Sequence, residues 1–201
     1  MAETLRGAVR QASGARACGM ELVPFWDLEL LGAATVLVVG RGALQDEIVR
    51  GLSRLGLGTV VVAEASHPLL SEPLPGQVDL IVHCGGDPCS RGGVRATCRR
   101  LAIPWIDVRL DVFHGLIATT LPGREATKEA DGAAERLASQ RESEIPANPA
   151  MAAIMGGLAA QEAAKVLLRA KGFPTLAGRI CLVDGQSYRM SVIEPAIPIV
   201  A

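Results

Sequence analysis

The 201-residue sequence has few aromatic side chains and no surplus of either charge. Aromatic residues make up 3% of the chain against 49% for all hydrophobic residues, so the core must be aliphatic. The formal net charge is -1, and no extended basic face is visible, which argues against nucleic acid as a partner. No apolar run approaches the length that crosses a bilayer, and the N-terminus lacks the apolar segment of a secretory signal. We therefore expect a cytoplasmic protein without a membrane partner.

Paired metal-binding cysteines are also lacking, because the five cysteines contain no C-x-x-C pair. This excludes the usual spacing of a zinc ribbon, and the odd number suits reduced thiols in a reducing compartment. The spacing of Cys84, Cys89 and Cys98, with His83 nearby, matches no usual metal site. We therefore expect no zinc.

Polar residues near two expected strand ends have two interpretations each. Cys89 directly precedes an expected helix, where it is either an activated nucleophile served by His83 or His114, or a capping residue. Asp107, Asp111 and His114 follow another expected strand, at a sheet edge where sites of α/β proteins form. Turn and surface roles explain these three residues equally well.

Thr35 to Glu64 has the pattern of a strand, a glycine turn, a helix and a second strand. This order is typical of the start of a doubly wound α/β domain. Gly40 and Gly42 would let a phosphate approach the first turn of the helix, and Glu64 would accept hydrogen bonds from a ribose. Gln45 stands where the nucleotide fingerprint has a third small residue. A strand–helix turn in a domain that binds no nucleotide is therefore the alternative.

The rest of the chain continues the alternation of strands and helices. Residues 1–34 read as an N-terminal arm, and 35–201 as one α/β domain with a mainly parallel, Rossmann-like sheet. Apolar patterns predict strands at 78–84, 103–108 and 113–120, helices at 90–101 and 151–170, and a terminal antiparallel hairpin of 178–183 with 188–193. Residues 65–77 read as a proline-rich loop, and 125–144 as a surface helix or a mobile loop.

The long helix near the end of the chain has a clear start signal. Asn148 is a suitable N-cap, and Pro149 suits the first helical position. The pair Gly156-Gly157 would let another backbone come close. Glu162 and Lys165, three residues apart, read as a surface ion pair or as part of a dimer contact.

Three separated segments together resemble the ThiF/MoeB/HesA family, which has the fold of ubiquitin-activating enzymes. The first, 36–64, begins VLVVGRGALQ and matches the nucleotide-binding half of the family. The second, 78–104, reads VDLIVHCGGDPCSRGGVRATCRRLAIP, and the third, 149–172, reads PAMAAIMGGLAAQEAAKVLLRAKG. Their order and spacing agree with the family over about half the chain.

The resemblance implies an enzyme that adenylylates the C-terminal glycine of a ubiquitin-like or sulfur-carrier protein with ATP and magnesium, usually as a dimer. It implies a catalytic role for Arg91, and for Asp87 if this residue takes the place of the magnesium-associated carboxylate. The cofactor-binding residues that it implies are Gly40, Gly42, Ala43, Leu44 and Glu64.

The sequence departs from the family between Glu64 and Val78. The family has a long insertion there, with an Asn, an Arg and a Lys that grip the triphosphate, whereas this segment contains no Lys or Arg. Phosphoryl-type sites act by neutralising negative charge with Arg, Lys and metal.

We therefore predict a catalytically degenerate, partner-dependent subunit of an adenylylation system. It would form a homodimer or a heterodimer with a ThiF-like subunit and bind a ubiquitin-like or sulfur-carrier protein or a peptide, with ATP and magnesium as the cofactors that the resemblance implies. The alternatives are an active ATP-dependent adenylyltransferase of that family and an NAD-dependent oxidoreductase.

Overall fold

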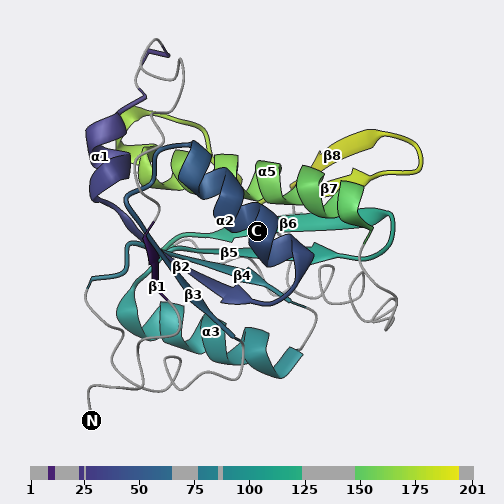
Figure 1. The fold of residues 1–201 in the computed structure, drawn as a ribbon, viewed down its shortest axis with the longest axis horizontal. Helices are drawn as coiled ribbons and strands as arrows, with labels where there is room; N and C mark the ends of the chain where they lie inside the picture. Colours follow the sequence, from purple (N-terminus) through teal and green to yellow (C-terminus); the bar gives the residue numbers. More distant parts are fainter. Residues whose placement is uncertain are drawn as a thin grey trace, which may run out of the picture.

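The structure, a computed structural model, describes residues 9–11, 23–24, 26–64, 77–85, 88–123 and 148–194. These residues form a sheet of eight strands with helices on both faces (Figure 1). The strands are β1 (Val9–Gln11), β2 (Thr35–Gly40), β3 (Thr59–Ala63), β4 (Leu80–Cys84), β5 (Trp105–Leu110), β6 (His114–Thr120), β7 (Ile180–Asp184) and β8 (Arg189–Ile193). The helices are α1 (Leu28–Ala33), α2 (Ala43–Arg54), α3 (Pro88–Leu101), α5 (Pro149–Leu167) and the short 3-10 helix η3 (Arg169–Lys171).

The sheet has a parallel half and an antiparallel half. Its strand order is β1-β3-β2-β4-β5-β6-β7-β8, and the pairs from β3 through β2 and β4 to β5 are parallel. From β5 to β8 every pair is antiparallel. The α/β fold and the terminal hairpin are thus confirmed. The antiparallel half begins one strand earlier than the hairpin, because a parallel pairing of β5 with β6 needs a crossover of about a dozen residues.

The chain reverses its direction of travel across the sheet after β3. It runs from β2 through α2 to β3 on one side, and β4 then pairs with the other side of β2. The carboxyl ends of β2 and β4, at Gly40 and Cys84, are therefore a topological switch point. Ligands of open α/β sheets bind in the crevice at such a point.

Alternation along the strands assigns side chains to the two faces. Val36, Val38, Leu80 and Val82 belong to the core under α2 and α5, whereas Leu37, Val39 and Ile81 belong to the core that also holds Val94 of α3. Figure 1 shows α2 and α5 on one side of the sheet and α3 on the other. His83 lies two residues after Ile81 and therefore points to the α3 side.

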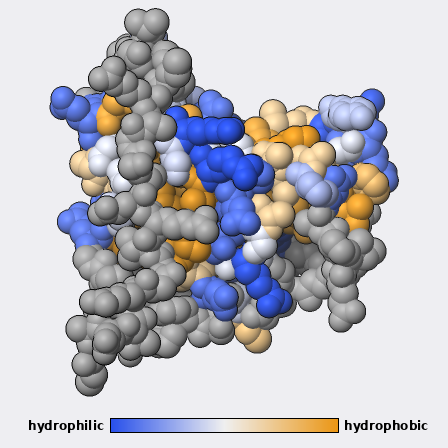
Figure 2. Space-filling model, viewed as in Figure 1, coloured by the Kyte–Doolittle hydropathy of each residue, from blue (hydrophilic) through white to orange (hydrophobic). Residues whose placement is uncertain are grey.

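Small residues bring α2 and α5 into close contact. A Cβ atom added to Gly156 would lie 2.9 Å from the backbone carbon of Glu47, and one added to Gly51 would lie 2.7 Å from the Cβ of Ala160. The backbone that approaches Gly156 is thus that of α2 in the same molecule. In Figure 2 hydrophilic residues lie along the outer surface of α2, with more hydrophobic residues beside them on α5.

Trp26 and α1 pack on the same body. Trp26 is buried, and its ring meets Phe173 edge-on with 5.8 Å between centroids. Asp27 caps α1 by accepting a hydrogen bond from the backbone N–H of Leu30. The predicted loop at 65–77, apart from residue 77, lies outside the described residues. The same holds for 125–144, predicted as a surface helix or a mobile loop, and for Asp87.

Candidate functional site

The glycine turn after β2 combines a packed residue with an open one. Gly40 has φ 153° and lies against the carbonyl oxygen of Cys84, so any side chain there would collide with β4. Gly42, the N-cap of α2, has φ 82° and open space where a Cβ would stand. The first N–H groups of a helix have no partner within the helix, and the helix dipole favours an anion beside them. Gly42 therefore leaves a place where a phosphate can approach α2.

The interior of this turn is filled by Gln45. Its Nε2 donates to the carbonyl oxygen of Gly40 at 2.8 Å and to that of Ala63 at 3.4 Å, and the residue is buried. The amide thus bridges the ends of β2 and β3, where the nucleotide fingerprint has a small residue. The turn is open at its rim and closed inside.

The predicted cofactor residues therefore divide into two groups. Gly42, Ala43 and Glu64 lie exposed at the rim of the turn. Gly40 packs on β4, and Leu44 is buried in the core beneath α2 and α5.

A buried cluster of polar side chains lies on the α3 side of the sheet. We call His83, Ser90, Arg91, Asp107 and Arg109 the His83 cluster. The parallel register of β4 and β5 pairs His83 with Asp107. Nδ1 of His83 and Oδ1 of Asp107 are 2.9 Å apart. Nε2 of His83 lies 3.2 Å from Oγ of Ser90, which is in the first turn of α3.

Two arginines hold the other oxygen of Asp107. Nε and Nη2 of Arg109 both lie 2.7 Å from Oδ2, and Nε of Arg91 lies 3.5 Å from it. Burial alone would raise the pKa of Asp107, but the hydrogen bond from His83 and the charges of Arg109, His83 and Arg91 hold it below its ordinary value. An ionised carboxylate accepts only, so Nδ1 of His83 carries the proton. In neutral His83, Nε2 is then left to accept from the Ser90 hydroxyl.

Of the two predicted catalytic residues, Arg91 and Asp87, the structure describes only Arg91. Arg91 lies in the His83 cluster and faces Asp107. Asp87 lies outside the described residues. Cys89 is exposed, and the hydrogen bond of His83 goes to the next residue, Ser90. Nothing in the sequence indicated Ser90, which lies seven positions beyond His83, in the first turn of α3.

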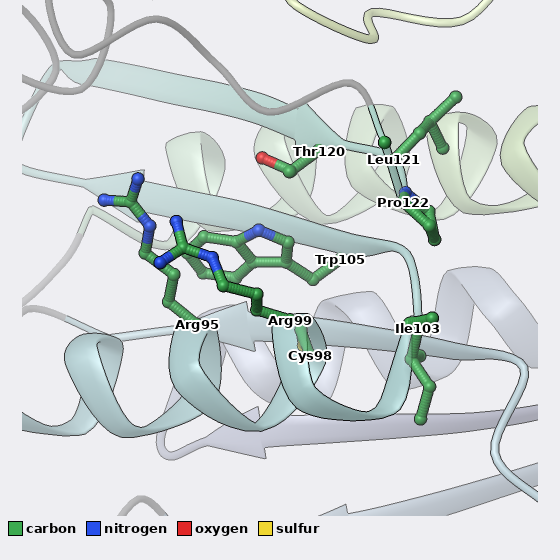
Figure 3. A pocket seen from close by; sticks show the side chains of 10 residues that line it. Arg95, Cys98, Arg99, Ile103, Trp105, Thr120, Leu121 and Pro122 are labelled. Atoms are coloured by element: carbon green, nitrogen blue, oxygen red, sulfur yellow. The ribbon is translucent and has the colours of Figure 1, made fainter.

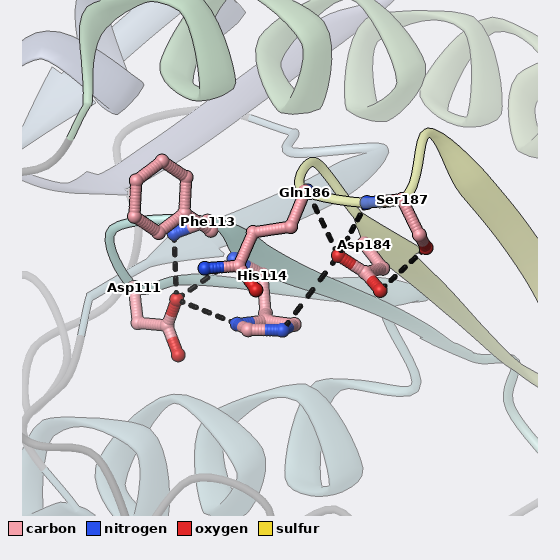
Figure 4. A network of polar contacts seen from close by, with 6 residues as sticks. All are labelled: Asp111, Phe113, His114, Asp184, Gln186 and Ser187. Atoms are coloured by element: carbon pink, nitrogen blue, oxygen red, sulfur yellow. Dashed lines mark hydrogen bonds and ion pairs between the residues drawn. The ribbon is translucent and has the colours of Figure 1, made fainter.

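The predicted group of Asp107, Asp111 and His114 is split between two places. Asp107 is in the buried cluster, whereas Asp111 and His114 form the turn between β5 and β6. There, His114 lies between Asp111 and Asp184 of the β7–β8 hairpin, with Nδ1 at 3.3 Å from one carboxylate and Nε2 at 3.8 Å from the other (Figure 4). Hydrogen bonds from the hydroxyl and backbone N–H of Ser187 lower the pKa of Asp184. This network joins two turns and is structural.

A small pocket lies further along the same face of β5. It has a volume of about 110 Å³ and is bounded by α3 and by the end of β6. Arg95 and Arg99 of α3 line it together with the indole of Trp105 (Figure 3). Since Trp105 and Asp107 are alternate residues of one strand, the pocket and the cluster share a face of the sheet.

Neither reactive thiols nor a group of metal ligands is found at the His83 cluster or at the pocket, among the residues that the structure describes. Burial raises the pKa of Cys84 and of Cys98 to about 12, so both thiols stay protonated near neutral pH. Among the residues that the structure describes, no three His, Cys, Asp or Glu side chains are grouped to hold a metal ion. In the same part of the chain, no helix has the length and apolar character of a membrane span.

Comparisons with known proteins give a likeness of fold. No protein-family model and no curated protein sequence matches this chain. A crystal structure of PaaA matches with a TM-score of 0.63 and 15% identity, over 85% of this chain and 67% of PaaA. E. coli MccB, crystallised with AMPCPP and MccA, matches with a TM-score of 0.67 and 12% identity, over 95% of this chain and 75% of MccB.

A third match is to a much longer protein. The heterocyclase TruD matches with a TM-score of 0.59 and 14% identity, over 89% of this chain but only 28% of TruD. The chain thus corresponds to about a quarter of that protein. At these identities the likeness concerns the fold alone.

These matches correct the family inferred from the sequence. The similar structures are PaaA, MccB and TruD, so the assignment to the ThiF/MoeB/HesA family is wrong. The function drawn from it, a degenerate subunit of an adenylylation system for carrier proteins, is wrong as well, and neither the active adenylyltransferase nor the NAD-dependent oxidoreductase is supported. Two glycines that carried the resemblance have packing roles in this fold. Gly40 allows close contact with β4, and Gly156 allows close contact with α2.

Proposed function

We propose that this chain is a peptide-binding protein in which an extended peptide adds as a strand along the outer edge of β8. The observation that carries the proposal is the exposure of this strand. All five residues of β8 are exposed, with Met190 at 61% and Val192 at 47%. In the part of the chain that the structure describes, β8 pairs with β7 on one side and with no strand on the other.

The edge offers the two features that strand addition needs. Every second residue of an edge strand directs its backbone N–H and C=O away from the sheet, where they pair with an incoming chain. Met190 and Val192 lie on one face of the strand and present apolar contacts to alternate side chains of that chain. Exposed apolar edges of this kind promote aggregation unless a partner covers them, which favours a binding role.

The comparisons support a polypeptide partner. Structures similar to this chain include MccB with MccA and a heterocyclase with its substrate. We infer the class of partner from them and not the reaction, because the chain spans 25% of that heterocyclase.

Selection from a random peptide display library on the immobilised chain tests the proposal. The selected peptide should slow hydrogen exchange of β8 amides, because new backbone hydrogen bonds protect them. The double variant Met190→Lys, Val192→Lys should weaken its affinity about tenfold or more by removing both apolar contacts. Ile154→Lys on α5, where Ile154 is 45% exposed, is the matched control and should bind as the wild type does. Protection that arises elsewhere, with β8 unaffected, would contradict this mode of binding.

A second candidate function, ATP binding with magnesium, is favoured by the open position at Gly42. A similar structure holds AMPCPP, and Gly42, Ala43 and Glu64 form an exposed rim around the first turn of α2. Titration calorimetry with AMPCPP, with and without magnesium, tests it. Gly42→Asp should abolish binding by placing a carboxylate at the phosphate position, whereas Gly123→Asp, which also has positive φ and open surroundings, should leave it intact.

The compartment follows from the thiols. The four described cysteines are free, and three of them are buried. We infer a reducing compartment, the cytoplasm, for the functioning protein.

A further inference from the structure

Three members of the His83 cluster are linked in the order carboxylate, imidazole, hydroxyl, which is the arrangement that activates a nucleophilic serine. Oδ1 of Asp107 holds Nδ1 of His83, and Nε2 of His83 faces Oγ of Ser90. An acid–imidazole–hydroxyl chain of this kind is recognised by its geometry and roles and occurs on unrelated folds. The three residues come from β5, β4 and α3, so the sheet register and the helix start together fix the arrangement.

The surroundings keep Asp107 ionised and orient its carboxylate toward His83. Arg109 donates to Oδ2 of Asp107 and Arg91 adds its charge at 3.5 Å from the same oxygen, which leaves Oδ1 for His83. The carboxylate then sets the tautomer of neutral His83, with the proton on Nδ1 and a lone pair on Nε2. Nε2 is therefore placed to take a proton from the Ser90 hydroxyl.

The position of Ser90 suits a developing negative charge. Ser90 lies in the first turn of α3, whose dipole directs its positive end toward that turn. Beside the imidazole, Gly85 has no side chain, and a Cβ there would lie 3.7 Å from Nε2 of His83. Ser90 is 7% exposed, which limits any substrate to a small acyl group.

We propose that Ser90, His83 and Asp107 form a nucleophilic site that hydrolyses small acyl esters, an activity separate from the proposed peptide binding. Oγ of Ser90 attacks the ester carbonyl carbon while Nε2 of His83 takes the hydroxyl proton. The bond from carbon to the alcohol oxygen breaks, and the alcohol leaves with that proton. Water then attacks the acyl-serine and gives a proton to His83. The carboxylic acid departs, and Ser90 regains its proton from His83.

A short-chain fluorophosphonate probe tests the proposal on the full-length chain. The probe should attach covalently to Ser90, as located by tandem mass spectrometry. Ser90→Ala should lose labelling and hydrolysis of p-nitrophenyl acetate about a thousandfold or more. Ser53→Ala and Cys89→Ala are matched controls, since Ser53 donates to the backbone of α2 and Cys89 is the exposed neighbour. Both should react as the wild type does.

Two outcomes overturn the proposal, one in the folded wild type and one in Ser90→Ala. If circular dichroism shows a folded chain and the probe leaves Ser90 unmodified while a known serine hydrolase in the same tube reacts fully, the proposal is overturned. Labelling that persists in Ser90→Ala overturns it too.

Discussion

Asp107→Asn is expected to be among the most damaging conservative substitutions in this protein. The carboxylate is 3% exposed and holds His83 on one oxygen and two guanidinium groups on the other. The asparagine side chain has nearly the same shape, but it carries no charge and offers a single acceptor oxygen. Two largely buried arginine side chains would then remain in the cluster without their shared carboxylate.

The magnitude follows from the removal of one partner of a buried ion pair. Such changes cost about 3 to 5 kcal/mol, because the remaining charges stay desolvated. Arg109 is 13% exposed, so water relieves part of this cost, and we expect about 3 kcal/mol. Domains are stable by about 5 to 15 kcal/mol, so the loss should be large but not complete.

The pH dependence provides an independent check. The pKa of Asp107 is lowered in the folded state, so its stabilising contribution is present above the ordinary Asp pKa and is lost as pH falls through the folded value. The difference in unfolding free energy between wild type and Asp107→Asn should therefore shrink below about pH 4. Urea unfolding followed by circular dichroism at pH 7 and at pH 3.5 measures it. Asp111→Asn, at an exposed turn where asparagine also accepts, is the control. A difference under about 1 kcal/mol at pH 7 would refute the reasoning.

Three further predictions concern other parts of the fold. Burial raises the pKa of Glu162, so folding stability should fall as pH rises from about 4.3, and Glu162→Gln should remove this slope in urea unfolding series. Gly156→Ala should destabilise by about 1 to 2 kcal/mol because its Cβ meets the α2 backbone, whereas Gly157→Ala, with open surroundings, should stabilise by about 0.5 to 1 kcal/mol in the same assay. Gln45→Ala should cost about 1 to 3 kcal/mol by leaving two carbonyl groups unsatisfied, yet raise AMPCPP affinity in calorimetry if the amide blocks the turn. The same pH slope in wild type and Glu162→Gln would contradict the first prediction. Equal effects of Gly156→Ala and Gly157→Ala would contradict the second, and an unchanged AMPCPP affinity of Gln45→Ala the third.

Elements set by local signals could be predicted from the sequence. The strand, helix and second strand expected within Thr35 to Glu64 are β2, α2 and β3. Asn148 caps α5 by accepting from the N–H of Ala150, with Pro149 first in the helix. Dipeptide and capping signals act within a few residues and need no knowledge of the rest of the fold.

Glu162 shows what the sequence of a helix leaves undetermined. It was expected on the surface with Lys165 or in a dimer contact, but it is buried and accepts from Thr119 of β6 and from the N–H of Leu176. A helix composed largely of alanine, glycine and aliphatic residues has no clear polar face, so periodicity cannot say which side meets the sheet. The acidic residue was taken for the solvent side because charged residues usually are.

The His83 cluster depends on information that no single segment contains. His83 and Asp107 are 24 positions apart, and a shift of the β4–β5 register by one residue would turn one of them to the opposite face of the sheet. Ser90 joins them only because α3 begins directly beyond β4 on that face. The glycines that suggested a nucleotide family are local and recur wherever a strand meets a helix closely. The ionisable and nucleophilic side chains of the His83 cluster are thus brought together by tertiary structure alone, which is why the sequence did not predict the cluster.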